Sequence, residues 1–349
     1  MARISTPITK LFGIDHPVIL AGMNVAAGPK LVAAVTNAGG LGVLGGLRST
    51  PSMLRSQIAE VKAALNRPDA PFGVDLAIPQ IGGSARLTNF DYTRGKLMEL
   101  IEIIIEEKAA VFVCAVGVPP KDVVDRLHEA KIPIMNMVGH PKHVPKALAA
   151  GVDLICAQGG EGGGHTGDIP TSLLVPACVD AVQGYRSPLT GEPVYVVAAG
   201  GIFDGRGLAS ALVYGASAVW VGTRFVASVE AAAPKLHKEA VLTATLDDDI
   251  RTLIYSGRPM RVRKTPYVRD WEESRQEEMK KLLAKGIIPA ERDLEKHPER
   301  SAESRRWLLG KVAGLIHEIL PAREIVENMV DEAVEKLSVA KVCATPSRL

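Results

Sequence analysis

The feature that most constrains the fold is a regular alternation of short apolar segments with longer amphipathic ones. Apolar segments rich in Val and Ile recur eight times, at residues 18–22, 41–46, 72–78, 111–117, 132–139, 154–159, 194–201 and 218–225. Buried parallel strands have such continuous apolar runs, and the stretches between them are long enough for crossover helices. Eight strand–helix units in about 245 residues predict an α/β fold, a (β/α)8 or TIM barrel. A doubly wound sheet is the alternative, because a sequence does not show the order of strands in space.

The stretches between the apolar segments carry helix start and stop signals. Residues 29–39 begin with Pro29 and end at Gly39, and residues 204–215 begin at a capping Asp204 and end at Gly215. Proline near the first turn and glycine after the last are typical of helix ends. The stretches 120–130 and 141–151 follow the same pattern, so we expect helices between the strands.

The last hundred residues break this alternation. Amphipathic helical spacing occurs at 271–286 and 321–337, and we find no strand alternation after residue 250. We therefore expect a barrel over residues 1–249 and a helical extension over 250–349 that packs on the barrel or covers its mouth. The basic segment 258–264 is interpreted as a solvated loop or an intramolecular contact, with an anion contact as the alternative.

Composition excludes several classes of protein. Lys and Arg number 41 against 39 Asp and Glu, and this net charge of +2 argues against nucleic-acid binding. None of the cysteines forms a C-x-x-C pair, so we expect neither a zinc site nor a dithiol, and Cys114 and Cys156 lie in apolar runs that predict burial. Without an apolar signal segment or a run of about 20 apolar residues, we expect a cytoplasmic protein that does not enter membranes.

One loop is unusually rich in glycine. Six glycines and His165 lie between Gln158 and Gly167, directly after the sixth predicted strand. In a barrel, loops at the carboxyl ends of strands form the active site. Such a glycine-rich backbone allows left-handed conformations or the close approach of a flat ligand, although a merely flexible loop is the alternative. We predict that His165 acts as a general base or orients the substrate. His140, by contrast, precedes a proline and is interpreted as a helix-start residue.

Other strand ends predict a site for a phosphorylated planar cofactor. The loops after the last two strands contain Gly200, Gly201, Gly222 and Thr223, whose backbone N–H groups suit a phosphate. Small residues at Ala21 and Gly22, followed by Met23, let a planar ring rest against backbone, and Asp75 and Gln80 lie where they would hydrogen-bond a heterocycle. One phosphate and one ring fit FMN. A dinucleotide is not favoured, because the turn after the first strand lacks G-x-G-x-x-G.

Several of these segments together resemble the nitronate monooxygenase family. They are AGM at 21–23, GVDL at 73–76, AQGGEGGGHTG at 157–167, AAGGI at 198–202 and VGTRF at 221–225. The resemblance implies an FMN-dependent barrel that oxidises alkyl nitronates with O2 to a carbonyl compound and nitrite. It implies that His165 is catalytic and that the cofactor contacts Ala21, Gly22, Met23, Gln158, Gly163 and Gly164, with its phosphate on Gly200, Gly201, Gly222 and Thr223. Asp75 departs from the family, where Asn is common, and so does the insertion at 82–96.

Other functions remain open at this stage. An NAD(P)H-dependent FMN reductase of quinone or enoyl substrates, a flavin-free lyase or isomerase and a non-enzymatic flavin-binding protein are the alternatives. The expected partners are a small nitronate and O2, and the expected state is a monomer or homodimer. Candidates for a cation near the flavin N1 position are Arg86, Arg224 and Lys311.

Overall fold

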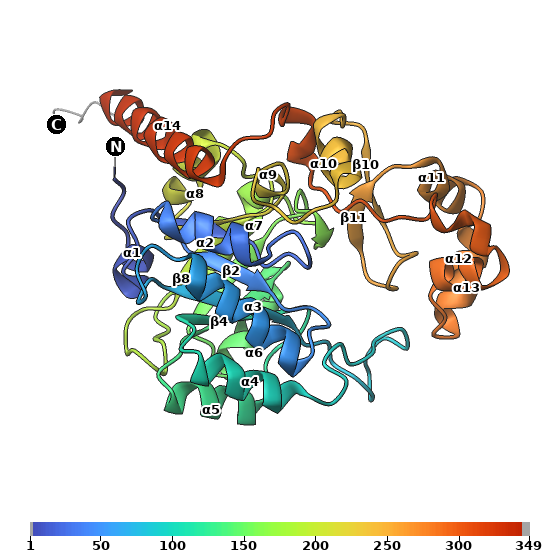
Figure 1. Ribbon diagram of the computed structural model, residues 1–349, viewed down its shortest axis with the longest axis horizontal. Coiled ribbons are helices and arrows are strands. Elements are labelled where there is room, and N and C mark those ends of the chain that lie inside the picture. The colour runs from blue at the N-terminus through green and yellow to red at the C-terminus, as the bar shows by residue number, and fades with distance from the viewer. Residues whose placement is uncertain (1–2, 344–349) are drawn as a thin grey trace.

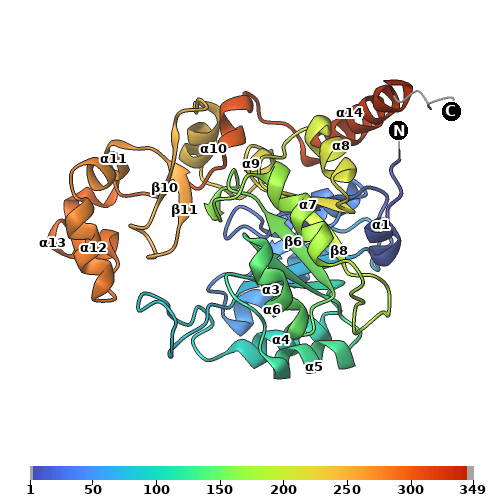
Figure 2. The same cartoon turned by 180° about the vertical axis from the view of Figure 1, so that it is seen from behind.

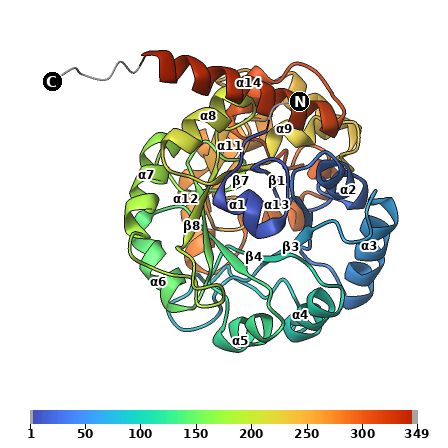
Figure 3. The same cartoon turned by 90° about the vertical axis from the view of Figure 1, so that its left-hand side faces the viewer.

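Eight parallel strands form a closed barrel in the computed structural model, which describes residues 3–343. Their order around the barrel is β1-β9-β8-β6-β5-β4-β3-β2, and the Leu20 N–H closes the ring by donating to the Leu41 carbonyl at 2.9 Å. The predicted (β/α)8 barrel is confirmed (Figure 3). The strands are β1 Val18–Leu20, β2 Gly42–Gly45, β3 Phe72–Ala77, β4 Val111–Ala115, β5 Ile134–Val138, β6 Leu154–Gln158, β8 Tyr195–Ala199 and β9 Ala218–Val221.

Side chains fill the barrel from wall to wall at its amino-terminal end. Inward-facing residues such as Val111, Leu154 and Ala218 are buried there in one cluster with Ile8 and Phe12 of helix α1 (Pro7–Phe12). Figure 3 shows α1 in the middle of the ring of strands. This end is therefore plugged by apolar side chains, and a ligand enters from the opposite, carboxyl end.

Helices surround the barrel at the predicted places. They are α2 Pro29–Asn37, α3 Pro51–Ala64, α4 Leu97–Glu106, α5 Lys121–Glu129, η1 Pro141–His143 with α6 Val144–Ala149, α7 Thr171–Ala181 and α8 Gly205–Val213. The Asp204 carboxylate accepts from the Gly207 N–H at 3.0 Å, which confirms the predicted helix cap. The segment expected as a strand at 218–225 instead ends at Val221, and the short helix α9 (Thr223–Val226) follows it.

The expectation that no strand follows residue 250 is wrong. Strands β10 (Asp249–Thr252) and β11 (Met260–Arg263) pair antiparallel, and β11 also pairs with β7 (Gly164–His165) in the glycine-rich loop. Each strand spans only two to four residues, too few for an alternation to stand out in the sequence. The predicted boundary after residue 249 falls inside β10, and the division into barrel and extension remains a prediction.

The single helix expected at 271–286 is two helices. Helix α11 (Pro266–Glu273) ends before Arg275, and α12 (Gln276–Ala284) follows it. The Arg275 guanidinium lies 3.5 Å from the centre of the Trp271 ring and donates to the Asp293 carboxylate at 2.9 Å. These contacts hold the chain in a turn between the helices. Together with α13 (Pro289–Lys296) and β11, the two helices build a small separate core. Helices α11, α12 and α13 lie together at one end of the molecule (Figures 1 and 2), and η2 (Pro298–Ser301) follows α13.

The chain returns to the barrel at its carboxyl terminus. After α10 (Lys235–Leu242) and η3 (Lys311–Leu315), helix α14 (Ala322–Cys343) packs on α8 and α2 (Figure 1). Met329 and Val330 are buried in the main core, and the Glu332 carboxylate accepts from the Gly205 N–H at 2.8 Å. Within residues 3–343, no helix has both the length and the apolar character required to span a bilayer. Cys114 and Cys156 are fully buried, as expected.

Candidate active site

A cavity of about 1480 Å³ opens at the carboxyl ends of the barrel strands. Loops that follow β1, β3, β4, β5, β6, β8 and β9 line it, and residues of the carboxyl-terminal hundred cover one side. The cavity is lined by the predicted catalytic histidine and by every residue predicted to hold the cofactor, apart from two of the three candidate cations for the flavin N1 position. They include Ala21, Gly22, Met23, Asp75, Gln158, Gly163, Gly164, His165, Gly200, Gly201, Gly222 and Thr223. Their individual roles remain predictions.

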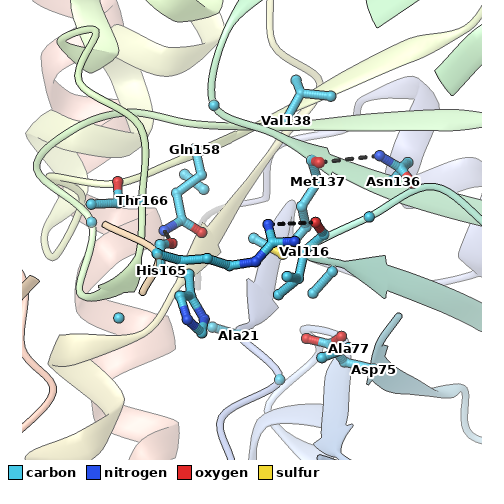
Figure 4. A pocket seen from close by; sticks show the side chains of 18 of the residues that line it. Ala21, Asp75, Ala77, Val116, Asn136, Met137, Val138, Gln158, His165 and Thr166 are labelled. Carbon is cyan, nitrogen blue, oxygen red and sulfur yellow. Dashed lines mark hydrogen bonds between the residues drawn. The ribbon is translucent and has the colours of Figure 1, made fainter. Parts of the chain in front are cut away.

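The glycine-rich loop after β6 is held by hydrogen bonds along its length. The Gln158 side-chain amide donates to the His165 carbonyl at 2.7 Å, and the Thr166 hydroxyl donates to the Gly159 carbonyl at 2.8 Å. His165 itself lies opposite Met260 in the β7–β11 pair. These contacts fix the backbone on both sides of the histidine. Figure 4 shows its ring projecting into the cavity.

Two arginines of the carboxyl-terminal strands hold the same loop from outside. The Arg261 Nε–H donates to the Gly160 carbonyl at 2.9 Å, and the same guanidinium forms a buried ion pair with Asp249. The Arg251 guanidinium donates to the Gly167 carbonyl at 2.7 Å. Arg261 thus makes the intramolecular contact that was one interpretation of the basic segment 258–264.

His165 is an uncharged imidazole at neutral pH. Its Nε2 shares a hydrogen bond of 3.0 Å with the Ser256 hydroxyl. Burial, with further contributions from the positive charges of Arg258 and Arg306, lowers the pKa of His165 to about 4. A neutral ring has a free nitrogen lone pair. It can therefore accept a proton or a hydrogen bond from a substrate.

Four backbone amides on two neighbouring loops, here called the amide cradle, are candidates for binding an anion. Within residues 3–343, the N–H groups of Gly200, Gly201, Gly222 and Thr223 have no acceptor. Gly200 and Gly201 have φ angles of 90° and 72°, which turn successive amides toward one side of the loop. The Thr223 hydroxyl oxygen accepts from the Gly310 N–H at 2.9 Å, and its own hydrogen stays available to a ligand. This arrangement fits one phosphate group.

Asp75 is a buried carboxyl group without a partner in the described part of the chain. It is 7% exposed, lines the cavity and forms no hydrogen bond or ion pair with residues 3–343. Burial raises the pKa of Asp75 well above its usual range, which favours the protonated form, and a protonated carboxyl group can donate a hydrogen bond. A Cβ atom at Gly22 would lie 2.3 Å from the Asp75 Cβ, so the first strand can pass this close only with glycine.

These features together fit FMN. The amide cradle lies on the loops after β8 and β9, and the unpartnered acid lies on β3, which is four strands away from β8 around the barrel. One end thus suits a phosphate, and the other offers a hydrogen-bond donor to the polar edge of a ring. The cavity volume of about 1480 Å³ leaves room for a second molecule.

Only one of the three predicted N1 cations lines the cavity. Arg86 does so and donates to the Gly257 carbonyl at 3.1 Å. Arg224 instead donates to the Ala227 and Glu318 carbonyls, and Lys311 lies 3.3 Å from the Asp249 carboxylate, both away from this cavity. Arg224 and Lys311 therefore stabilise the fold, which corrects their assignment as candidate flavin contacts. The backbone carbonyl of Gln80 accepts from the Asn89 side chain, and Gln80 also lines the cavity.

Sequence reasoning missed Arg258 and Val116. The Arg258 guanidinium donates to the Val116 carbonyl at 3.2 Å and to the Asn89 side chain at 3.1 Å, and it has no acidic partner within residues 3–343. Val116 has a φ of 71°, which is rare for a β-branched residue and costs about 1–3 kcal/mol. Strain of this kind recurs at functional sites. The only sequence signal was the basic character of segment 258–264.

Metal ligands do not gather in this part of the molecule. Among the described residues, no group of His, Cys, Asp and Glu side chains is arranged to hold a metal ion. His140 accepts from the Lys142 N–H at 3.0 Å, so it caps η1 as the sequence suggested.

Comparison with known proteins agrees with this geometry. The family model described as nitronate monooxygenase matches residues 5–332. A (3aS,4S,5R,7aS)-5-hydroxy-7a-methyl-1-oxo-octahydro-1H-indene-4-carboxyl-CoA dehydrogenase of Mycobacterium tuberculosis is 41% identical over 270 residues, which cover 77% of this chain and 69% of the relative. A probable nitronate monooxygenase of Staphylococcus saprophyticus is 31% identical over 74% of this chain and 78% of its own length.

A solved structure matches nearly the whole chain. FabK from Thermotoga maritima is 32% identical, with a TM-score of 0.78, and the match covers 98% of this chain and 100% of FabK. The match to FabK thus includes both the barrel and the carboxyl-terminal hundred residues, and the names of the two sequence relatives describe oxidoreductases. The chain is an enzyme of the oxidoreductase type and belongs to the nitronate monooxygenase family.

Proposed function

We propose that this protein is an FMN-dependent oxidoreductase that acts on a large acyl-CoA thioester. The size of the cavity is the observation that carries the proposal. Its volume of about 1480 Å³ exceeds the roughly 300–1,000 Å³ of ordinary small-molecule sites, so it has room for a cofactor and an extended substrate. The mycobacterial dehydrogenase, 41% identical to this chain, supports the thioester, because its name specifies the CoA derivative of a fused-ring acid.

The chain's own residues would hold the cofactor in a defined orientation. The amides of Gly200, Gly201 and Gly222 would bind its phosphate, and Asp75 would donate a hydrogen bond to the polar edge of its ring. When bound, FMN would accept the hydride that leaves the substrate carbon and pass both electrons to an external acceptor.

His165 and Arg258 would manage the proton and the oxygen of the substrate. Oxidation of an alcohol carbon to a carbonyl releases a proton from the hydroxyl in addition to the hydride. The neutral His165 ring would take that proton. The cationic Arg258, whose charge acts on His165, would stabilise the negative charge that develops on the oxygen.

The test is anaerobic reduction of the bound flavin by substrate. A cyclic hydroxyacyl-CoA should remove the visible absorbance of the oxidised flavin and yield a product lighter by two hydrogens in mass spectrometry. The same acid without CoA is the control and should act weakly. The proposal fails if hydroxyacyl-CoA compounds leave the flavin oxidised while NADH or NADPH with a quinone turns over rapidly.

Nitronate oxidation by O2 is the second candidate function. The observation that favours it is the pair of a neutral His165 and an unpaired Arg258 in one cavity, which suits a small organic anion, together with the family match. The products would be a carbonyl compound and nitrite. Nitrite release from a primary alkyl nitronate under air, faster than any acyl-CoA oxidation, would place this function first.

A further inference from the structure

We propose that a basic patch at the mouth of the cavity binds the phosphates of coenzyme A. The patch consists of His140, Lys142, His143 and Lys146, which η1 and the first turns of α6 carry directly after β5. All four residues line the cavity that contains His165. The inference rests on the proposed acyl-CoA substrate and names the part of the protein that would recognise it.

The charge of the basic patch is not neutralised by the protein. Within residues 3–343, none of its four side chains takes part in an ion pair, and Lys142 and Lys146 are exposed. The rings of His140 and His143 lie 5.8 Å apart between their centres. Burial, followed by the charges of Lys142, His140 and Lys146, lowers the pKa of His143, as expected for a ring among positive groups.

Acidic residues of the same cavity are mostly engaged elsewhere. The Asp168 carboxylate lies 2.8 Å from the Arg251 guanidinium, and the Glu161 carboxylate accepts from the Thr171 hydroxyl at 2.8 Å. Asp91 accepts hydrogen bonds within its own turn, from Thr93 and Gly95. Among residues 3–343, Asp75 and Asp122 are the acidic lining residues whose side chains have no such partner, and Asp75 lies deep in the cavity at β3. Lys142 and Lys146 thus keep their charges free of any ion pair within residues 3–343, and such a local pair of positive charges attracts a polyanion.

The basic patch is separate from the amide cradle for FMN. It follows β5, whereas the cradle follows β8 and β9, and β6 lies between β5 and β8 in the barrel. The two anion sites thus flank the loop that carries His165. Coenzyme A has its phosphates at one end of a long pantetheine arm and its thioester at the other. Phosphates on the patch would let the arm enter the cavity and bring the acyl group to His165.

The test is binding of free CoA to the FMN-loaded protein, measured by calorimetry. The variant is the double substitution Lys142→Gln, Lys146→Gln. We expect it to weaken CoA binding by about tenfold or more and to reduce the dependence of affinity on salt, because exposed charge–phosphate contacts are screened by ions. Both side chains are exposed, so the melting temperature should not change. Lys121→Gln is the matched control, since Lys121 already pairs with Asp125 at 2.6 Å.

Comparison of ligands decides what the basic patch recognises. Pantetheine, which lacks the nucleotide phosphates, should bind wild type and double variant equally. Equal affinity of CoA for both proteins would overturn the inference, and so would tight binding of an acyl carrier protein with no binding of CoA. If CoA binds through the two lysines but hydroxyacyl-CoA does not reduce the flavin, the inference about the basic patch is supported and the proposed function is contradicted.

Discussion

At the scale of single residues, His165 is the side chain on which turnover should depend most. Replacement by Asn keeps a polar group of similar shape but removes the proton acceptor. We expect His165→Asn to retain bound FMN and to lower turnover by about a hundredfold or more, the usual contribution of a general base. The measurements are the flavin spectrum and the steady-state rate. His297→Asn, an exposed histidine of the carboxyl-terminal hundred, is the control. Undiminished turnover in His165→Asn would remove the ring from the chemistry.

The pH dependence of His165 has a definite sign. Its pKa of about 4 in the folded protein lies below the usual 6.5, so the unfolded chain binds more protons between these values. Stability should therefore fall as the pH drops from 6.5 toward 4, and activity should remain level from neutral pH to the same region. His165→Asn should lose its share of this acid-side decline in denaturant titrations at several pH values, while His16, His143 and His237, whose pKa values burial also lowers, keep theirs. An activity limb near the ordinary histidine pKa would contradict the assignment.

Asp75 should show the opposite dependence. Its pKa is raised, so the folded protein keeps a proton that the unfolded chain loses above its usual value of 3.8. Stability should decrease as the pH rises from 3.8 toward the raised folded pKa, and Asp75→Asn should abolish that decrease. An amide also donates a hydrogen bond, so FMN affinity should stay within about tenfold of wild type. If the stability of Asp75→Asn falls with rising pH as much as that of wild type, a group other than Asp75 is responsible for the decrease. FMN affinity is measured separately by fluorescence.

At the scale of elements, the pairing of β7 with β11 brings residues far apart in the sequence to one site. Arg261 binds both the Gly160 carbonyl and the Asp249 carboxylate, and neither charge is exposed. Removing one member of a buried ion pair costs about 3–5 kcal/mol. Arg261→Met should therefore destabilise the protein by up to about that amount in chemical denaturation, because Lys311 still lies 3.3 Å from the Asp249 carboxylate, and it should loosen the loop that carries His165.

The control for Arg261 is an exposed ion pair of the same segment. Arg269 lies 3.8 Å from Glu273 with both side chains more than half exposed. Such pairs contribute about 0–1 kcal/mol, so Arg269→Met should change the unfolding free energy little. If Arg261→Met changed the unfolding free energy as little as Arg269→Met, the contacts of Arg261 with Gly160 and Asp249 would not contribute to stability.

The elements also show what the sequence could and could not predict. The eight barrel strands were predictable because each is buried on both faces and therefore continuously apolar. Strands β10 and β11 were not, because their four-residue pattern of polar and apolar residues acquires meaning only beside β7. The interruption between helices α11 and α12 at Arg275 could not be predicted for a similar reason. Neither Gly nor Pro marks it, and the Trp271 and Asp293 contacts that produce it are tertiary.

The residues of the candidate site also fall into those that the sequence could predict and those that it could not. Residues directly after barrel strands, such as His165 and Asp75, were predictable because the fold brings all strand ends to one face. Arg258, which lines the cavity, and Ser256, which is hydrogen-bonded to His165, belong to the carboxyl-terminal segment, about ninety residues further along the chain than His165. Local sequence does not encode where such a segment folds back, so these two residues were missed.

At the scale of the whole molecule, the carboxyl-terminal hundred residues contribute to two different cores. Met329 of α14 is buried in the main core with the outer faces of the barrel strands. Met279 of α12 is buried in the separate core around Trp271. A cooperative unit unfolds together when its parts share one core, whereas a small core of its own can open locally. The two methionines therefore form a matched pair for testing how the tail is coupled to the barrel.

Truncation of each methionine should have a different consequence. Met→Ala in a core costs about 2–5 kcal/mol. Met329→Ala should lower the unfolding midpoint of the whole protein, measured together by circular dichroism and by release of bound FMN, because α14 closes the barrel core. Met279→Ala should leave that midpoint nearly unchanged and instead raise the rate of proteolytic cleavage within residues 266–301, where the separate core would open first. If Met329→Ala and Met279→Ala lower the unfolding midpoint equally, the barrel and the carboxyl-terminal hundred residues unfold as one cooperative unit. The predicted division after residue 249 would then describe a change in sequence pattern and not a boundary between units of stability.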